Sequence, residues 1–361
     1  MPILSLPSAV LVTGGTGYIG AWVIAVLLER GHTVKAVVRS GDKGEVLRND
    51  LLRHTSKSEI ALEAVVIEDL LKEGAFDDAV VGVDAVVHLA SPVVLDGSGD
   101  PENIIKPAVG AVLGVLKSAL RASQADGNAS LKRIVITSSV AAVYIPEPEE
   151  ARVFTEADWN EVSLVEVKGL GAKASGMAKY RASKVYSERA VWEFYDAHKA
   201  EIKWDITTLN PPWVFGVWPP IQDPATLLDM PMTLKLWYGT VVASEPPKTR
   251  EAMQSNQGWI DVRDLAEAHV RALEKEEAGG ERILVVESTY IFQEWLDIAN
   301  KVGSKVYKKP LPKGFPDLTE GVLSYKVNYN TEKEKRILGV TYQSKEETAR
   351  DILQWTATKG W

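Results

Sequence analysis

Val12-Thr-Gly-Gly-Thr-Gly-Tyr-Ile-Gly20 decides the fold, because it joins a short apolar run, Ala9–Thr13, to a segment with helical periodicity, Tyr18–Arg30. Glycines permit a tight turn and a close approach of the backbone to a pyrophosphate, and the next helix offers free N–H groups and a positive dipole end. An ordinary glycine-rich turn is the alternative. Because the setting is strand–turn–helix, we predict a dinucleotide-binding turn.

Beyond this turn, β-rich runs alternate with helical segments, which is typical of βαβ units in a parallel sheet covered on both faces. We predict an α/β fold, a Rossmann-type doubly wound parallel sheet with a smaller C-terminal α/β substrate lobe. Residues 1–210 would bind the nucleotide, and residues 211–361 would mainly form the lobe, with Ile260–Leu273 and its neighbours returning to the first domain. The other predicted strands are Thr33–Val38, Ala64–Ile67, Ala85–Leu89, Arg133–Thr137, Trp204–Leu209 and Ile283–Val286. The other predicted helices are Glu45–Lys57, Phe76–Val80, Asn103–Arg121, Gly176–Lys199, Val262–Leu273, Thr331–Leu338 and Lys345–Thr356, while Tyr144–Ser175 is predicted to be a loop.

The composition excludes several classes of protein. The net charge of −8 and the absence of a basic block argue against binding to nucleic acid or to an anionic membrane surface. The chain has no Cys, so disulfides, thiolate catalysis and Cys-ligated metals are excluded. We see neither a signal-like N-terminus nor an apolar run long enough to cross a membrane. A cytoplasmic monomer or homodimer acting on a small molecule is therefore the expectation.

The end of the second predicted strand indicates which nucleotide binds. An NAD-binding unit places an acidic residue there to take the ribose hydroxyls, but this chain has Arg39, with Lys43 close behind. Cationic side chains bind a 2′-phosphate, whereas a carboxylate repels it, so the sequence favours NADPH. Solvated surface cations are the alternative. Asp69 and Leu70, after the third strand, are placed to meet the adenine, although Asp69 could equally be a loop carboxylate.

Tyr180 and Lys184 are the candidate catalytic pair. Residues four apart share one face of a helix, where a lysine can stabilise tyrosinate and lower the pKa of the phenol. Tyr195/Lys199 and Tyr329/Lys333 have the same spacing. Only the N-terminal part of a helix that returns along a parallel sheet lies near the ligand, and Tyr195 is about 22 Å further along the axis. Tyr329 lies in the irregular C-terminal region, so we choose Tyr180.

A serine hydroxyl at the end of the predicted strand Arg133–Thr137 could hold a substrate carbonyl oxygen beside this phenol. Ser138 and Ser139 both stand there, and capping of the strand end is the alternative. The five His residues fall in no nucleophile-elbow or metal-ligand spacing.

These motifs together resemble the extended short-chain dehydrogenase/reductase superfamily. Within it, the chain is most similar to the dihydroflavonol-4-reductase-like branch and to fungal NADPH-dependent carbonyl reductases of the methylglyoxal-reductase type. The resemblance covers nearly the whole chain. Besides the glycine turn, it rests on Arg39 with Lys43, Glu68–Leu70, His88–Pro92, Thr137–Ser139, Tyr180–Lys184, Asn210–Gly216 and Trp259–Asp264.

The resemblance implies a role for each matching residue. Tyr180 would be the general acid, Lys184 would lower its pKa and hold the nicotinamide ribose, and Ser139, rather than Ser138, would orient the carbonyl. Cofactor contacts would come from Gly14, Thr16, Gly17, Tyr18, Ile19, Arg39, Lys43, Asp69, Leu70, Ala90, Tyr180, Lys184, Pro211, Trp213 and Val214. The substrate would meet Val93, Tyr144, Met177 and Trp213. The family usually has Gly-Pro where this chain has Gly216-Val217, which leaves the contacts of that turn open.

The expected reaction is hydride transfer from NADPH to a ketone or aldehyde with a bulky or aromatic substituent, with the proton delivered by Tyr180. One alternative is a nucleotide-sugar epimerase or dehydratase, or a hydroxysteroid dehydrogenase, on the same scaffold. A non-catalytic NADP(H)-sensing regulator is the alternative from another class, although such proteins tend to lose the Tyr/Lys pair.

Overall fold

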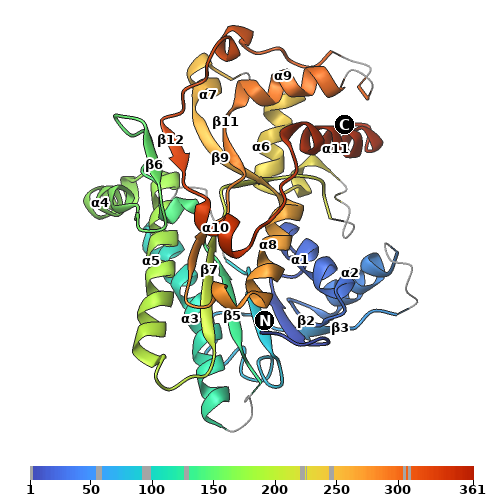
Figure 1. The fold of residues 1–361 in the computed structure, drawn as a ribbon, viewed down its shortest axis with the longest axis vertical. Helices are drawn as coiled ribbons and strands as arrows, with labels where there is room; N and C mark the ends of the chain where they lie inside the picture. The colour runs from blue at the N-terminus through green and yellow to red at the C-terminus, as the bar shows by residue number, and fades with distance from the viewer. Residues whose placement is uncertain are drawn as a thin grey trace.

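The computed structural model describes residues 3–53, 59–91, 99–125, 130–219, 224, 226–243, 248–303, 306–307 and 310–361. Its centre is a seven-stranded sheet with the order β10-β7-β5-β4-β1-β2-β3, in which all pairings are parallel (Figure 1). The order reverses between β1 and β4, where a doubly wound sheet binds its ligand. The strands are β1 (Ala9–Thr13), β2 (Thr33–Val38), β3 (Leu62–Val66), β4 (Ala85–His88), β5 (Arg133–Thr137), β7 (Asp205–Asn210) and β10 (Arg282–Leu284).

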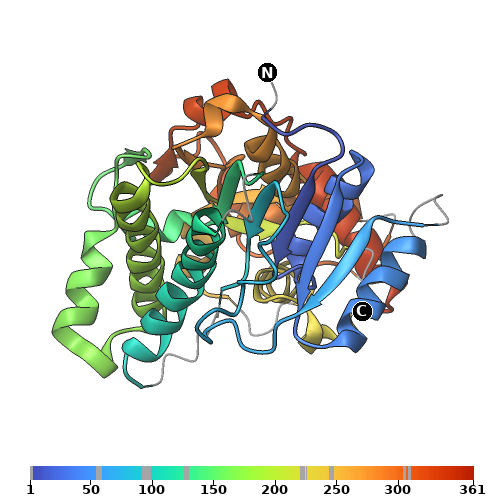
Figure 2. The same cartoon turned by 90° about the horizontal axis from the view of Figure 1, so that it is seen from below.

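Two helical layers cover this sheet because successive side chains of each strand point to opposite faces. Val10 and Val12 pack with helices α1 (Tyr18–Glu29), α2 (Gly41–Arg53) and α8 (Val262–Glu274). Leu11 packs on the other side with α3 (Glu102–Gln124) and α5 (Gly176–His198). Figure 2 shows α3 and α5 side by side there, with α4 (Glu161–Leu170) beyond them. The predicted doubly wound α/β fold is thus confirmed.

The smaller lobe lies above the sheet in Figure 1. Its three-stranded sheet has the order β11-β9-β8, and β12 pairs separately with β6. Trp295 stands at the centre of its core, and its ring meets Trp259, Trp237 and Phe215 edge to face. The elements are β6 (Arg152–Phe154), β8 (Trp213–Phe215), β9 (Asn256–Asp261), β11 (Ser288–Ile291), β12 (Val327–Tyr329), α6 (Met232–Val241), α7 (Arg250–Gln254), α9 (Phe292–Gly303), α10 (Glu332–Ile337) and α11 (Lys345–Thr358).

Two sequence predictions of local structure are wrong. Phe76–Val80 forms turns rather than a helix, with Phe76 fully buried against the α3 side of the sheet. The segment 144–175 is not all loop, because it contains β6 and α4. Helix α4 begins after Asn160, whose side chain accepts a hydrogen bond from the backbone N–H of Ser163. The other predicted elements are present with ends shifted by a few residues, and the predicted end of the second helix, residues 54–57, lies outside the described residues.

Helix α3 is long and apolar enough to cross a membrane when only its length and composition are considered. Half of its most apolar window is buried, and the helix packs against α5. Buried core helices of globular proteins pass the same test, so this feature carries no argument for a membrane.

Candidate functional site

The glycine turn forms a backbone cradle at the start of α1. Gly14 has φ +70°, a region that favours glycine, and a Cβ on Gly20 would lie 2.2 Å from the carbonyl oxygen of Gly14. Gly17 precedes the helix without a side-chain cap, and the first turn carries no acidic residue. The first N–H groups of a helix have no partner within it, so this end fits a pyrophosphate. Thr16 and Ile19 lie within the cradle, and the backbone N–H of Ala90 donates to Thr13 Oγ1 beside it.

The predicted nucleotide contacts stand at the ends of β2 and β3. Arg39 directly follows β2, and Lys43 is exposed in the first turn of α2. Neither pairs with a carboxylate in the part of the chain that the structure describes. Asp69 Oδ1 accepts the backbone N–H of Leu71 at 2.9 Å, so this carboxylate caps its own turn. Leu70 packs against the core on the α3 side of the sheet.

Tyr180, Lys184 and Ser139 come together where β5 meets α5. Ser175 caps α5 by accepting the N–H of Ala178, which places Tyr180 near the start of the helix. Lys184 Nζ lies 5.8 Å from the centroid of the Tyr180 ring and donates to Ser91 Oγ at 3.3 Å. Ser139 follows β5, lines the same cavity as Tyr180 and acts to lower the pKa of its phenol. The structure therefore brings together the three residues nominated as catalytic.

The electrostatics of this trio differ from the sequence expectation. Burial raises the pKa of Tyr180, and the hydrogen bond from Ser139 opposes that rise only in part. Burial lowers the pKa of Lys184 to about 8, against the charge of Glu188. The causes of the shift in the Tyr180 pKa are desolvation and Ser139, so the expected lowering of that pKa by Lys184 is not found. A raised pKa keeps the phenol protonated, which is the state that a proton donor needs.

The two serines have different environments. Ser138 Oγ donates to Glu188 Oε2 at 2.5 Å and is buried, so it is occupied in the interior. Ser139 Oγ accepts the N–H of Ala141 and lies 3.4 Å from the Pro211 carbonyl oxygen, to which it donates. Ser139 also lines a cavity, which makes it the serine available to a ligand.

This cavity is about 80 Å³ in volume and lies between the start of α5, the end of β5 and the lobe. The predicted substrate residues Tyr144, Met177 and Trp213 line it, and Val93 lies outside the described residues. Pro211 and Val214, which were predicted to contact the nicotinamide, lie outside this lining. The Pro211 carbonyl binds the Ser139 loop, and Val214 is buried in β8. The lining residues are Ser139, Val140, Ala141, Tyr144, Met177, Tyr180, Pro212, Trp213, Met232 and Thr233.

Sequence reasoning missed Met232 and Thr233. Both belong to α6, which follows a proline-rich stretch and shows little amphipathic pattern. Pro212 lies within the Asn210–Gly216 motif, which is the sequence signal for its place in the cavity. The tryptophans between residues 213 and 259 have two different roles. Trp213 lines the cavity, whereas Trp237 and Trp259 are fully buried in the core of the lobe.

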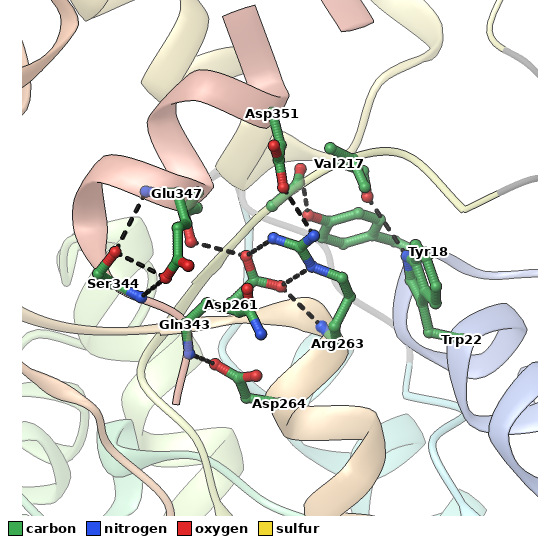
Figure 3. Close-up of polar contacts among 12 residues, drawn as sticks. Tyr18, Trp22, Val217, Asp261, Arg263, Asp264, Gln343, Ser344, Glu347 and Asp351 are labelled. Carbon is green, nitrogen blue, oxygen red and sulfur yellow. Dashed lines mark hydrogen bonds and ion pairs between the residues drawn. The ribbon is translucent and has the colours of Figure 1, made fainter. Parts of the chain in front are cut away.

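A second group of polar contacts connects helix α1 to the lobe (Figure 3). The Tyr18 hydroxyl donates to the Gly216 carbonyl oxygen at 2.8 Å, and Trp22 Nε1 donates to the carbonyl of Val217. Gly216 has φ +126°, and a Cβ there would lie 3.0 Å from Asp261 Oδ1. The open question about Gly216-Val217 is thus answered in part, because both carbonyls of this turn bind side chains of α1.

The buried Asp261 holds the opposite side of this region (Figure 3). Its carboxylate pairs with Arg263 at 2.8 Å and accepts the hydroxyl of Thr348, from α11, at 2.7 Å. Arg263 in turn reaches Asp351 at 2.7 Å. Near them, the Asp264 carboxylate accepts the backbone N–H of Gln343 at 2.7 Å, just before α11. The C-terminal helix is therefore attached to α8 by side chains.

Comparison with known proteins identifies the family of this chain. Residues 10–286 match the model of the NAD dependent epimerase/dehydratase family. A ketoreductase of Aspergillus niger is 31% identical over 94% of this chain and 94% of its own length. The NADPH-dependent methylglyoxal reductase of Saccharomyces cerevisiae is 30% identical over 95% of this chain and 96% of its own.

The fold comparison agrees. The crystal structure of the yeast methylglyoxal/isovaleraldehyde reductase complexed with NADPH aligns with a TM-score of 0.81 at 28% identity, covering 98% of this chain and 99% of that one. The resemblance drawn from the motifs is confirmed, and the chain belongs to the NAD dependent epimerase/dehydratase family, within the extended short-chain dehydrogenase/reductases.

Proposed function

We propose that this protein is an NADPH-dependent carbonyl reductase that converts a bulky or aromatic ketone or aldehyde to an alcohol. The observation that carries the proposal is the meeting of Ser139 and Tyr180 at one otherwise mainly apolar cavity. Two hydroxyl groups beside an apolar space can bind one carbonyl oxygen and leave the rest of the substrate in contact with carbon. The ketoreductase and NADPH-dependent reductase among the relatives support the same chemistry.

The cradle at Gly14–Gly20 would hold the pyrophosphate, and Arg39 with Lys43 would bind the 2′-phosphate. Lys184, one turn beyond Tyr180, would hold the nicotinamide ribose. NADPH supplies the hydride when bound. The exposure of Arg39 and Lys43 leaves both cations free to reach a phosphate, which supports the choice of NADPH over NADH.

Tyr180 is the proton donor in this proposal. Its raised pKa keeps the proton on the phenol until negative charge develops on the substrate oxygen. The Ser139 hydroxyl, which donates to the Pro211 carbonyl over a long 3.4 Å, would turn to donate to the same substrate oxygen and so fix the carbonyl. Lys184 Nζ lies 5.8 Å from the centroid of the Tyr180 ring, so the ribose that it would hold stands beside the phenol.

The shape of the cavity limits the substrate. We expect a volume of about 80 Å³ to enclose the carbonyl and one flat substituent between Met177 and Trp213. Met232, which lines the cavity, is 43% exposed, so the remainder of a large substrate would extend past it to the surface. Aryl ketones and aldehydes fit this description.

The test is turnover of NADPH by the purified protein with a panel of aryl ketones and aldehydes, followed by the absorbance of the reduced cofactor. We expect consumption with NADPH in excess of that with NADH, and loss of turnover in Tyr180→Phe without loss of NADPH binding. Consumption equal to that of Tyr180→Phe would refute the reductase and leave the NADP(H)-sensing regulator. Preference for NADH would refute the role of Arg39 and Lys43.

A further inference from the structure

Glu188 is a buried carboxylate that the reaction described above does not use. It lies on α5 one helical turn beyond Lys184, and its side chain is 0% exposed. Four side chains donate to its two oxygens, two from β7, one from β10 and one from the residue that follows β5. The donors are Arg282 Nε at 2.5 Å, Ser138 Oγ at 2.5 Å, Asn210 Nδ2 at 2.7 Å and Thr208 Oγ1 at 3.3 Å.

Two of these donors control the loop that carries Ser139. Ser138 precedes Ser139 directly, and Asn210 Nδ2 also donates to the Ser139 carbonyl oxygen at 3.1 Å. The next residue after Asn210 is Pro211, whose carbonyl accepts both Ser139 Oγ and the backbone N–H of Val140. The Ser139 loop is therefore held by Ser138 on one side and by Asn210 on the other, and both of these residues donate hydrogen bonds to the Glu188 carboxylate.

The same carboxylate faces the catalytic lysine. Glu188 and Lys184 line one small cavity of about 10 Å³ together with Ser138 and His88. Of the charged and titratable groups around Lys184, Tyr180 and His88 hold no negative charge near neutral pH, since burial and the charge of Lys184 lower the pKa of His88 to about 4. Glu188 opposes the effect of burial on Lys184, whose pKa is nevertheless lowered to about 8. Glu188 thus supplies the negative charge that favours a protonated Lys184.

We propose that Glu188 is a positioning residue for the reduction, which fixes the Ser139 hydroxyl and the Lys184 ammonium through one buried carboxylate. The inference rests on the proposed function for its kinetic consequences. It differs from a purely structural role because the carboxylate touches both the loop of one catalytic side chain and the cavity of another. Glu188 is not the only partner of Arg282. The Arg282 guanidinium also donates to the carbonyls of Glu156 and Asp158, and it lies 3.8 Å from the centre of the Trp159 ring.

The chain offers a matched control at the other end of strands β5 and β7 of the same sheet. Arg133, at the start of β5, pairs with Asp205, at the start of β7, with Nε to Oδ1 at 2.5 Å and Nη2 to Oδ2 at 2.8 Å. Arg133 is 1% exposed and also donates to backbone carbonyls, including that of Ala272. Asp205→Asn and Glu188→Gln therefore remove the same charge from a buried arginine, but only Glu188 lies beside the site.

The experiment compares the wild-type protein, Glu188→Gln, Glu188→Asp and Asp205→Asn by kcat, KM for NADPH, Tm and the pH dependence of kcat. We expect Glu188→Gln to lower kcat at least about tenfold and to move its alkaline limb down by about one pH unit, because Lys184 loses its proton more easily. Glu188→Asp keeps the charge and should restore the position of the limb. Asp205→Asn should lower Tm and leave the limb in place.

A measurement without turnover separates this proposal from the proposed function. Cyanate carbamylates unprotonated lysine, and the modification of Lys184 can be followed by peptide mass spectrometry across a pH series. In Glu188→Gln this modification should begin about one pH unit lower than in the wild type, whether or not the protein reduces any ketone tested. If the kcat limb and the carbamylation profile both match the wild type, and only Tm falls as in Asp205→Asn, Glu188 is merely structural and the proposal is wrong.

Discussion

The sheet half and the lobe reach stability by different means. In the sheet half, neighbouring strand residues such as Val10 and Leu11 pack into two apolar cores, one on each face of the sheet. In the lobe, three short strands close over aromatic rings around Trp295. The joint between the halves uses buried polar groups, above all Asp261 and the Tyr18 hydroxyl. Because one buried apolar cluster runs from the α1 and α8 side of the sheet into the lobe around Trp295, these directional contacts set the orientation of a joint that is itself apolar.

Asp261→Ala should break the joint and have the largest effect. It leaves Arg263 without its buried partner and Thr348 without its acceptor, so we expect a loss of about 3–5 kcal/mol in the free energy of unfolding. Denaturant unfolding followed by tryptophan fluorescence measures it. The control is Asp351→Ala, which removes the more exposed carboxylate of the same arginine and should cost at most about 1 kcal/mol. Equal losses in the two variants would show that burial of Asp261 is not the cause.

Gly20→Ala should damage the sheet half without touching the lobe. The new Cβ would lie 2.2 Å from a backbone oxygen that cannot move aside, and we expect a loss of about 3 kcal/mol together with weakened NADPH binding. Gly31→Ala is the control, because its φ is +87° but nothing lies within 4 Å of the added carbon. It should cost about 1 kcal/mol of stability and leave the NADPH titration unchanged. Unaltered NADPH affinity in Gly20→Ala would contradict the placement of the pyrophosphate.

Asp264 should make the attachment of the C-terminal helix sensitive to pH. Burial, with the charges of Asp261 and Glu287, raises the pKa of Asp264 to about 7. Because the folded state then keeps a proton that the unfolded state releases, its contribution is complete below about pH 4 and is lost as pH rises toward 7.

The change attributable to Asp264 should be about 1–2 kcal/mol between pH 5 and pH 8. Urea titrations of the wild type and of Asp264→Asn at the two pH values isolate it, because the amide does not titrate. The prediction fails if the difference between the two proteins is the same at both pH values.

The same contrast explains what the sequence could and could not predict. The sheet half was predictable because glycine turns, apolar runs and helical periodicity are local signals, and the Tyr180/Lys184 pair follows from helix direction. The part of the cavity wall formed by Met232 and Thr233 could not be predicted, because it depends on where α6 packs. The raised pKa of Tyr180 could not be predicted either, because it depends on burial rather than on residue spacing. The Glu188 contacts join residues up to 94 positions apart, a relation that no local pattern encodes.

Tyr18→Phe should sharpen the comparison with the smallest change. The substitution keeps the ring that stacks on Trp218, with centroids 5.8 Å apart, and removes only the hydroxyl that donates to the Gly216 carbonyl. A single buried hydrogen bond contributes about 1 kcal/mol to the free energy of unfolding, so we expect a loss of that size, measured by urea titration. Because burial raises the pKa of Tyr18 well above its usual value, the phenol stays neutral and the loss should not vary with pH, in contrast to that of Asp264. Tyr18 is also the first residue of α1, which follows the glycine turn. A larger rise in KM for NADPH than in KM for the ketone would show that this contact couples the lobe to the cofactor. Equal rises in the two KM values would confine its role to holding the joint.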